Sequence, residues 1–264
     1  MLIKLLKYDL KYMIKNMLAF YILAVFFAIT TRLLFELDQS IIINIIHNMS
    51  LGCTYAMIVN ILINTMIRSW VRFNDSLYKD ESYLTHTLPV TKKDLYNSKF
   101  IQSLIFYAIG FIVILISLFI VHYSKENWQA ITNYIKTITI GLNMSTGFFV
   151  SMTVIVIFLE VFNAIQCGFF GLILGHKQNN NKIPYSIFFG FLVYLIAQSI
   201  VLSLVFIFGL FDSSIMELFK TTTINIDVNA FKTLAIVSSI LYVIIIFSMS
   251  VICKKMLNKG VNVE

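Results

Sequence analysis

The residue types that most often carry chemistry are scattered along this chain. Its histidines and cysteines occupy positions His47, His86, His122, His176, Cys53, Cys167 and Cys253. None of their spacings is that of a zinc site, and the motifs H-E-x-x-H and G-x-S-x-G do not occur. We therefore predict no catalytic residue and no metal site.

The sequence also has no phosphate-binding loop. The glycine-rich segment 168–178, GFFGLILGHKQ, comes nearest to G-x-x-x-x-G-K-[ST], but no hydroxyl residue follows its lysine. We therefore expect no cofactor in this chain. If the chain works with ATP, then ATP and magnesium must be bound by a partner subunit.

Some polar residues lie inside apolar segments and are candidates for function. Glu160 is near the middle of the fourth apolar segment, where a charge costs at least about 2.5–3.5 kcal/mol. At helical spacing, Thr153, Asn163 and Cys167 extend a polar stripe from it, and Gln198 lies midway along the fifth segment. Glu160 is a candidate for a translocation path, for gating or for pairing between subunits. Hydrogen bonds between helices would also explain the amides.

A second polar stripe is predicted in the second apolar segment. Asn60 and Asn64 share a helical face with Cys53 and Met57, and this face leads down to Arg68. The same two interpretations apply: a translocation path, or contacts between helices.

The composition explains why so many positions are apolar. Hydrophobic residues make up 59% of the 264 positions and charged residues 12%, against roughly 25% charged in a soluble domain. The net charge of +7 is spread in small clusters at the ends of apolar runs, which is typical of membrane topology and argues against nucleic acid. We predict an all-α, polytopic membrane protein in which residues 1–264 form a single transmembrane domain.

Six segments reach the length of about 20 apolar residues that a helix needs to cross a bilayer. They are residues 17–34, 49–67, 100–121, 147–174, 184–211 and 234–253. With the N-terminus inside, the inner connections hold three quarters of the 20 Lys and Arg residues, whereas acidic residues divide evenly. The positive-inside rule therefore predicts that both termini face the cytoplasm.

The residues before the first span form a basic amphipathic pattern. Lys4, Lys7, Lys11 and Lys15 fall on one helical face and apolar residues take much of the other. We expect residues 1–16 to form an interfacial helix on anionic lipid, although a simple topology signal would also place lysines here.

The connection predicted at residues 68–99 is long and strongly polar. Leu77, Glu81, Leu84 and Leu88 are spaced as one face of a short helix, with an N-cap among residues 74–76, and Pro89 stops it. A capping box at residues 91–94 then starts a helix that leads into the third span. Such a structured segment is either a docking element for a cytoplasmic partner or a cap on the membrane bundle. A shorter connection, residues 122–142, contains an amphipathic stretch at 128–138.

The basic N-terminus MLIKLLKYDLKYMIKNM, the six spans and the loop SLYKDESYLTHTLPVTKKDLYNSK together resemble the membrane subunit of type 2 ABC transporters, the small permeases of Gram-positive bacteria. The phrase YLTHTLPV and the later SK carry most of the resemblance. It implies that the first cytoplasmic loop forms a coupling helix seated on a separate ATPase. The implied coupling residues are Tyr78, Glu81, Tyr83, Leu84, Thr85, His86, Thr87 and Leu88.

The function expected from this resemblance is that of a permease in the plasma membrane. It would export or extract an amphiphile such as a peptide, antibiotic or lipid, together with a second permease copy or a sister permease and an ABC ATPase. The alternative is a membrane sensor or immunity protein whose loop docks a regulatory partner without any ATPase. An intramembrane enzyme is the least supported class because the chain lacks candidate catalytic residues.

Overall fold

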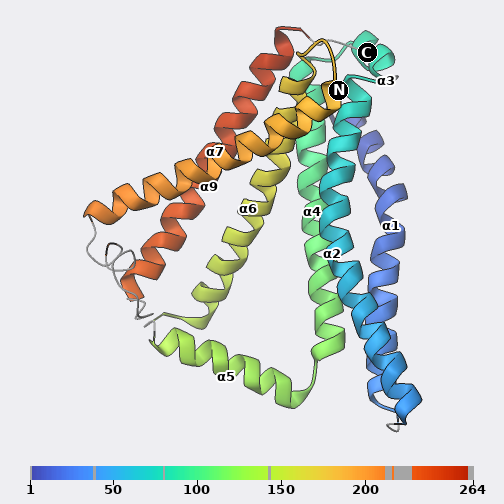
Figure 1. The fold of residues 1–264 in the computed structure, drawn as a ribbon, viewed down its shortest axis with the longest axis vertical. Helices are drawn as coiled ribbons and strands as arrows, with labels where there is room; N and C mark the ends of the chain where they lie inside the picture. Colours follow the sequence, from blue (N-terminus) through green and yellow to red (C-terminus); the bar gives the residue numbers. More distant parts are fainter. Residues whose placement is uncertain are drawn as a thin grey trace. The chain divides into compact units, whose positions relative to one another are not determined.

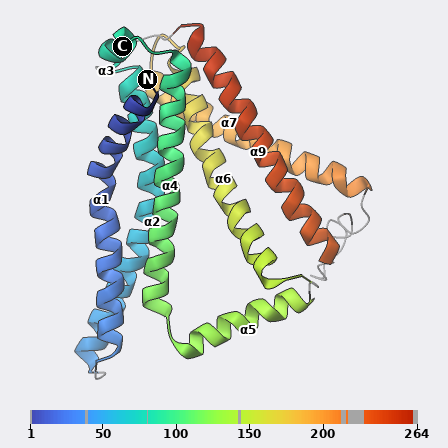
Figure 2. The ribbon, with the colours of Figure 1, turned by 180° about the vertical axis from the view of Figure 1, so that it is seen from behind.

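The computed structural model describes residues 2–37, 40–79, 81–141, 144–211, 216 and 228–260. Every regular element within them is a helix, as predicted (Figures 1 and 2). In chain order the helices are α1 (Leu2–Phe35), α2 (Ile41–Leu77), α3 (Glu81–Thr87), α4 (Lys92–His122), α5 (Lys125–Gly141), α6 (Thr146–Gly175), α7 (Lys182–Phe211) and α9 (Val228–Asn258).

Six of the described helices are long and apolar enough to cross a membrane: α1, α2, α4, α6, α7 and residues 232–258 of α9. Each contains one of the six predicted spans, so the prediction of a multi-pass membrane protein is confirmed at this level. The expected orientation of the termini remains a prediction, because it concerns the two sides of a membrane.

Most of these helices continue beyond the apolar stretch that predicted them. The 37 residues of α2 extend about 55 Å, well over the length that crosses a bilayer. Hydropathy indicates only the part of a helix that is surrounded by lipid. The helix itself continues beyond that part where neighbouring helices still pack against it. Within the connection predicted at 68–99, residues 68–77 belong to α2, which was not expected, whereas residues 92–99 belong to α4, as the capping box predicted. The expected position of this connection in the cytoplasm stays a prediction.

The N-terminal region also differs from the predicted boundary. Residues 2–35 form one uninterrupted helix of 34 residues, so residues 1–16 are not a helix separate from the first span. A single face of α1 is buried along nearly its whole length, at Asp9, Met13, Met17, Ala24, Ala28 and Thr31. Packing on the neighbouring helices thus continues from the basic segment into the apolar segment, and the helix has no reason to break.

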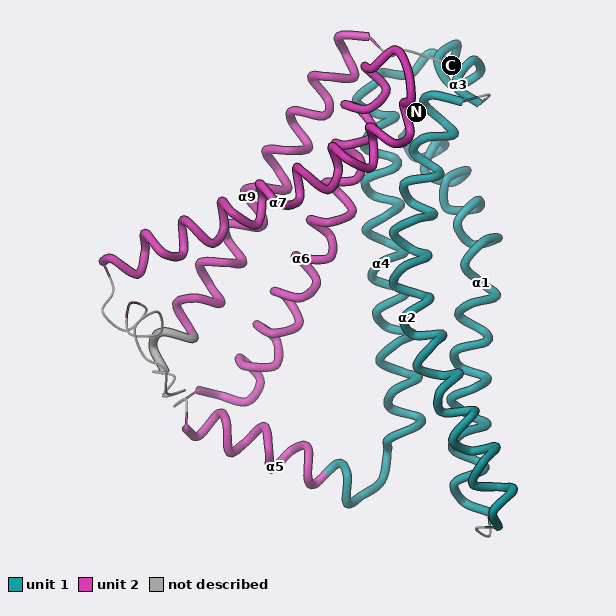
Figure 3. The backbone as a smooth tube through the Cα atoms, viewed as in Figure 1, with its two compact units in different colours: residues 1–128, 263–264 teal, residues 129–262 magenta. Residues whose placement is uncertain are grey.

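The chain divides into two compact units, coloured separately in Figure 3. In unit 1, which covers the described residues up to Trp128, α1 packs against α2 and α4, α2 packs against α4, and α3 lies against α2. Its apolar core is formed by two clusters, one around Met13, Met17 and Phe106 and the other around Ala24, Ile61 and Ile114.

In unit 2, which covers the described residues from Gln129, α6 packs against α7 and α9. The first of these contacts is made by small residues. A Cβ atom at Gly171 would overlap the backbone of Ser186 and Gly190, and one at Gly175 would overlap Ser186. The two helix backbones therefore touch through a small-xxx-small pattern on each side, a common way for membrane helices to associate.

The connection between α2 and α4 is a helix, a proline corner and a helix, as predicted. Its details differ, because α2 runs on to Leu77 and the short helix begins only at Glu81. The predicted N-cap among residues 74–76 is therefore wrong, and Leu77 belongs to a different helix from Leu84 and Leu88. The predicted start of the next helix is confirmed: the Thr91 hydroxyl accepts a hydrogen bond from the Asp94 N–H at 3.1 Å.

The amphipathic stretch predicted at 128–138 lies within the helix α5. A connection of similar length is expected between the fifth and sixth spans, at residues 212–231, and it falls almost entirely outside the described residues.

Candidate functional site

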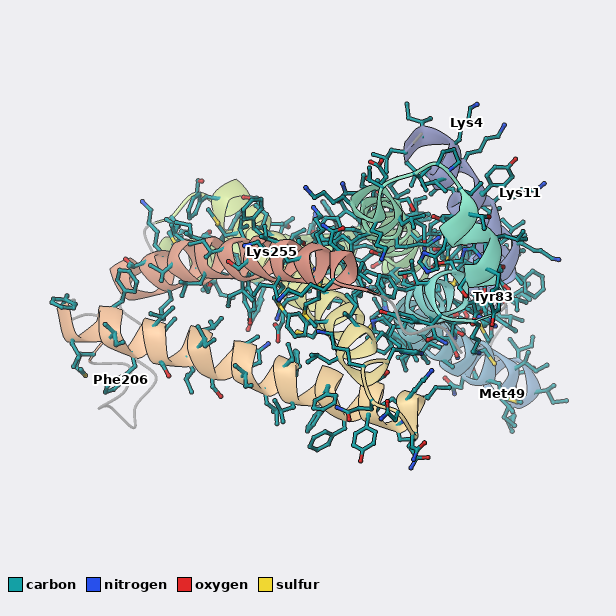
Figure 4. The ribbon with its side chains drawn as sticks, turned by 90° about the horizontal axis from the view of Figure 1, so that it is seen from above. Lys4, Lys11, Met49, Tyr83, Phe206 and Lys255 are labelled. Atoms are coloured by element: carbon teal, nitrogen blue, oxygen red, sulfur yellow. The ribbon has the colours of Figure 1, made fainter. Side chains whose placement is uncertain are left out.

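The short helix α3 presents one face to solvent and the other to the bundle of unit 1. Tyr83 and Leu84 are 64% and 74% exposed, and Leu88 just after the helix is also exposed. On the opposite side Ser82 is fully buried, and the His86 ring is hydrogen-bonded to the Leu77 carbonyl at 3.1 Å. Figure 4 shows Tyr83 on this helix. An exposed apolar face on a helix fastened from behind is suited to contact another protein.

The predicted coupling residues do not all belong to that face. Thr87 is exposed with Tyr83 and Leu84, whereas Thr85 is half-buried. Tyr78 is only 2% exposed, because it ends α2 and its ring lies 6.5 Å from that of Phe73. Tyr78 therefore holds the base of the connection in place and is not part of the exposed surface.

Behind α3 lies a cluster of buried charges drawn from three long helices. Asp9 of α1 accepts a hydrogen bond from Arg72 Nε of α2 at 2.9 Å and one from Ser98 Oγ of α4 at 2.8 Å. Lys99 of α4 forms an ion pair with the same carboxylate. The side chains of Asp9, Lys99 and Arg72 are 2%, 4% and 11% exposed, so these charges lie inside protein.

Arg72 connects this cluster to α3. Its Nη1 lies 2.6 Å from the Glu81 carboxylate, while its Nε pairs with Asp9 and its guanidinium stacks on the Tyr12 ring at 4.7 Å from the centroid. The planar fork of arginine suits such simultaneous contacts, which a lysine could not make. Arg72 of α2 therefore ties Glu81, the first residue of the short helix, to Asp9 of α1.

The four charges of the cluster balance, which is the condition for burying them. Asp9 and Glu81 carry two negative charges, and Arg72 and Lys99 carry two positive charges. Removing an ion from water costs several kcal/mol unless it is paired and hydrogen-bonded. The Glu81 side chain is 52% exposed, so the network runs from the solvent-facing helix into the interior of the bundle.

Sequence reasoning did not find this cluster as a unit. The resemblance singled out Ser98 and Lys99 as the SK pair, and both side chains bind Asp9. Asp9 itself carried a usable signal. It is the one acid among the first 16 residues, and it precedes Met13 and Met17 at intervals of four, which places a carboxylate on an otherwise apolar buried stripe.

The four N-terminal lysines lie away from this stripe. Lys4, Lys7, Lys11 and Lys15 are all exposed, and Lys4 and Lys11 project outward from α1 (Figure 4). Their expected contact with anionic lipid stays a prediction.

Asn60 and Asn64, the two asparagines predicted to form a polar stripe, do not line the buried face of α2. The Asn60 amide donates to the Ala56 carbonyl at 3.0 Å and the Asn64 amide donates to the Asn60 carbonyl at 3.0 Å, so both bonds stay within α2. In the apolar part of α2 the buried polar residues are instead the hydroxyls of Ser50, Thr54, Thr65 and Ser69. Among them Ser50 lies 2.8 Å from the Thr31 hydroxyl of α1, a contact between helices.

The remaining candidates lie in unit 2. Asn163 is fully buried and its Oδ1 lies 4.0 Å from the Cys167 sulfur, while Gln198 accepts a hydrogen bond from Tyr242 of α9 at 3.0 Å. Glu160 is half-buried and close enough to Tyr242 to interact electrostatically. Sequence reasoning missed the contact that joins α6 to α9, in which Gln166 donates to Ser250 at 3.1 Å.

Among the residues that the structure describes, no group of three or more His, Cys, Asp or Glu side chains is arranged to hold a metal ion. Comparisons with protein-family models, with curated proteins and with solved structures find no match to this chain. Any statement of function therefore depends on the residues and contacts described above.

Proposed function

We propose that the chain is the transmembrane permease subunit of an ATP-driven ABC transporter, and that α3 is its coupling helix. The observation that carries the proposal is the Glu81–Arg72–Asp9 network, because it links a short, solvent-facing helix to the membrane-crossing helices behind it. A helix that transmits force needs such a link. A helix that only caps the bundle needs burial alone.

In this mechanism, an ATPase subunit binds ATP and magnesium and contacts the exposed face of Tyr83, Leu84, Thr87 and Leu88. When two ATPase subunits close, they displace α3, and the displacement passes through Glu81 and Arg72 to α1, α2 and α4. Rigid movement of packed helices is a common form of such switching. The polypeptide described here supplies the membrane path and the docking helix, and its partner supplies the hydrolysis.

The proposal places the protein in the plasma membrane with both termini in the cytoplasm, and it includes a second permease copy or a sister permease. The apolar helices, the buried amide of Asn163 and the half-buried amide of Gln198 are compatible with an amphiphilic substrate such as a peptide, an antibiotic or a lipid. The half-buried carboxylate of Glu160 is a group in unit 2 suited to a cationic part of such a substrate, because it is an acidic side chain within a candidate membrane span.

Purification from the native membrane tests the proposal. An ABC ATPase should co-purify, and Leu84→Asp should weaken its association at least about tenfold, because a residue central to an interface commonly contributes about 2 kcal/mol. Glu81→Gln should retain the ATPase but lower transport, since it removes one charge from the link to Arg72. Lys93→Asp, on an exposed residue outside α3, is the matched control and should retain both.

Two results would overturn the proposal. One is a preparation that contains no ATPase and whose transport survives Leu84→Asp. The other is a non-ATPase protein bound at Leu84, which would identify the chain as a membrane sensor or immunity protein whose loop docks a regulator.

A further inference from the structure

Helix α5 is amphipathic, and most of its residues are exposed. On a helical projection, Trp128, Ile131, Ile135 and Ile138 gather on one side, and Asn133 lies directly opposite. Trp128 is 52% exposed and Ile131 46%, and Ile135 and Ile138 are half-buried, so the described residues of the protein leave this apolar side uncovered at its Trp128 end and partly covered beyond it. The proposed transport function assigns no role to this helix.

Short connections join both ends of α5 to candidate membrane spans. Only Tyr123 and Ser124 separate it from the end of α4, and residues 142–145 separate it from the start of α6. Both α4 and α6 are candidate membrane spans. A helix joined so closely to the ends of two spans has to lie at the surface of the bilayer, on the side opposite α3.

Hydrogen bonds at the corner between α4 and α5 hold the start of α5 in place. Arg32 of α1 donates from Nη1 to the Tyr123 carbonyl at 2.7 Å, and the Asn127 amide donates to the His122 carbonyl at 3.0 Å. The first turn of α5 is closed by the Ser124 hydroxyl, which accepts from the Asn127 N–H at 2.9 Å. The start of α5 is thereby held at the end of α4.

The apolar side of α5 is continuous with the exposed surface of α4. The ring of Trp128 meets that of Phe119 edge-on, with 6.3 Å between their centroids. Phe119 is 53% exposed and belongs to a run of exposed apolar residues along α4 that includes Ile112 and Ile116. In a membrane-crossing helix, exposed apolar residues such as these face the acyl chains of the lipid. The apolar side of α5, which begins at Trp128, therefore starts where the lipid-facing surface of α4 ends.

We propose that α5 is an interfacial helix whose Trp128–Ile131–Ile135–Ile138 face lies in the phospholipid layer on the side of the membrane opposite α3. Tryptophan is enriched at this depth, because its ring is apolar while its N–H remains near water. The opposite face, around Asn133, stays in water. The partner of this surface is the lipid bilayer, and the proposal holds whether or not the chain is a transporter.

Tryptophan fluorescence tests the proposal, because Trp70 and Trp128 are the two tryptophans of the chain. In Trp70→Phe, reconstituted in vesicles, Trp128 is the only tryptophan. Its emission should be blue-shifted, and phospholipids brominated near the glycerol end of the acyl chains should remove most of it. Lipids brominated near the terminal methyl should quench it less. An emission maximum typical of a water-exposed tryptophan, with quenching by iodide but not by brominated lipid, would overturn the proposal.

A second measurement does not depend on replacing Trp70. It uses two single variants, Ile131→Cys on the apolar face and Asn133→Cys on the opposite face. Each is reconstituted in vesicles that are made permeable, so that a water-soluble maleimide reaches both surfaces of the membrane. Asn133→Cys should react several times faster, because the thiol of Ile131→Cys is covered by lipid. Equal rates in vesicles would overturn the proposal.

Discussion

Asp9 accepts contacts from three side chains on two other helices, although it lies in a segment otherwise dominated by lysine. Arg72, Ser98 and Lys99 all converge on its carboxylate. At the scale of single residues, this carboxylate makes it possible to keep an arginine and a lysine inside the protein. Each of these positive charges would otherwise be buried at a cost of several kcal/mol.

Asp9→Asn should therefore destabilise the protein strongly. The substitution preserves size but removes the charge that neutralises Lys99, and breaking a buried ion pair on one side typically costs about 3–5 kcal/mol. We expect a clearly lower unfolding temperature in detergent, measured by circular dichroism. The double variant Asp9→Asn, Lys99→Met should recover part of the loss, because it no longer leaves a lysine unpaired.

Asp75→Asn is the matched control for this prediction. Asp75 pairs with Lys79 at 3.3 Å, with side chains 28% and 43% exposed, and pairs near the surface are worth about 1 kcal/mol or less. An equal loss of stability in Asp75→Asn and Asp9→Asn would show that burial of the cluster does not matter.

At the scale of elements, the two units of the chain associate their helices by different means. In unit 1, α1, α2 and α4 are joined at one end by charges and along their length by apolar side chains. In unit 2, α6 and α7 approach so closely at Gly171 and Gly175 that no side chain fits between their backbones. Lipid supplies no hydrophobic force between helices, so close packing of this kind has to provide the attraction.

Gly171→Ala should weaken the α6–α7 contact, because the added methyl group overlaps backbone atoms of Ser186 and Gly190 that cannot rotate away. Overpacking of this kind typically costs about 1–3 kcal/mol. Gly147→Ala is the control on the same helix, since a Cβ there meets no atom within 4 Å. Thermal unfolding in detergent should separate the two variants, and equal midpoints would contradict a tight crossing.

At the scale of the whole molecule, the positions of α3 and α5 on opposite sides of the membrane follow from the single crossing of α4 between them. From the distribution of Lys and Arg, the positive-inside rule predicts that the α3 side faces the cytoplasm. The proposed ATPase contact requires this orientation, while the proposed lipid contact of α5 is independent of it.

Labelling of single introduced cysteines tests the orientation. Lys125→Cys at the start of α5 should react with a membrane-impermeant maleimide in intact cells, whereas Lys93→Cys should react only after permeabilisation. Both positions are exposed, and two of the native cysteines, Cys167 and Cys253, are buried, so the unmodified chain gives the background. The reverse labelling pattern would place α3 outside the cell and would exclude an ATPase partner.

The sequence by itself determined the features that depend on neighbouring residues. Apolar length located six spans, Pro89 and Thr91 marked the corner before α4, and the spacing of the lysines put them on the exposed side of α1. Local periodicity could not show where a helix continues past its apolar stretch, because packing against other helices decides this. That is why residues 68–77 were expected in a connection and belong to α2.

Only the tertiary structure decided which polar residues meet. Asp9 and Arg72 are 63 positions apart and Asp9 and Lys99 are 90 apart, and neither pair shares a pattern that reveals the contact. Each side chain is unfavourable when buried alone and acceptable only when the register of α1, α2 and α4 brings all of them together. The amphipathic side of a helix is encoded in its own residues, whereas the pairing of buried charges depends on how separate helices are aligned.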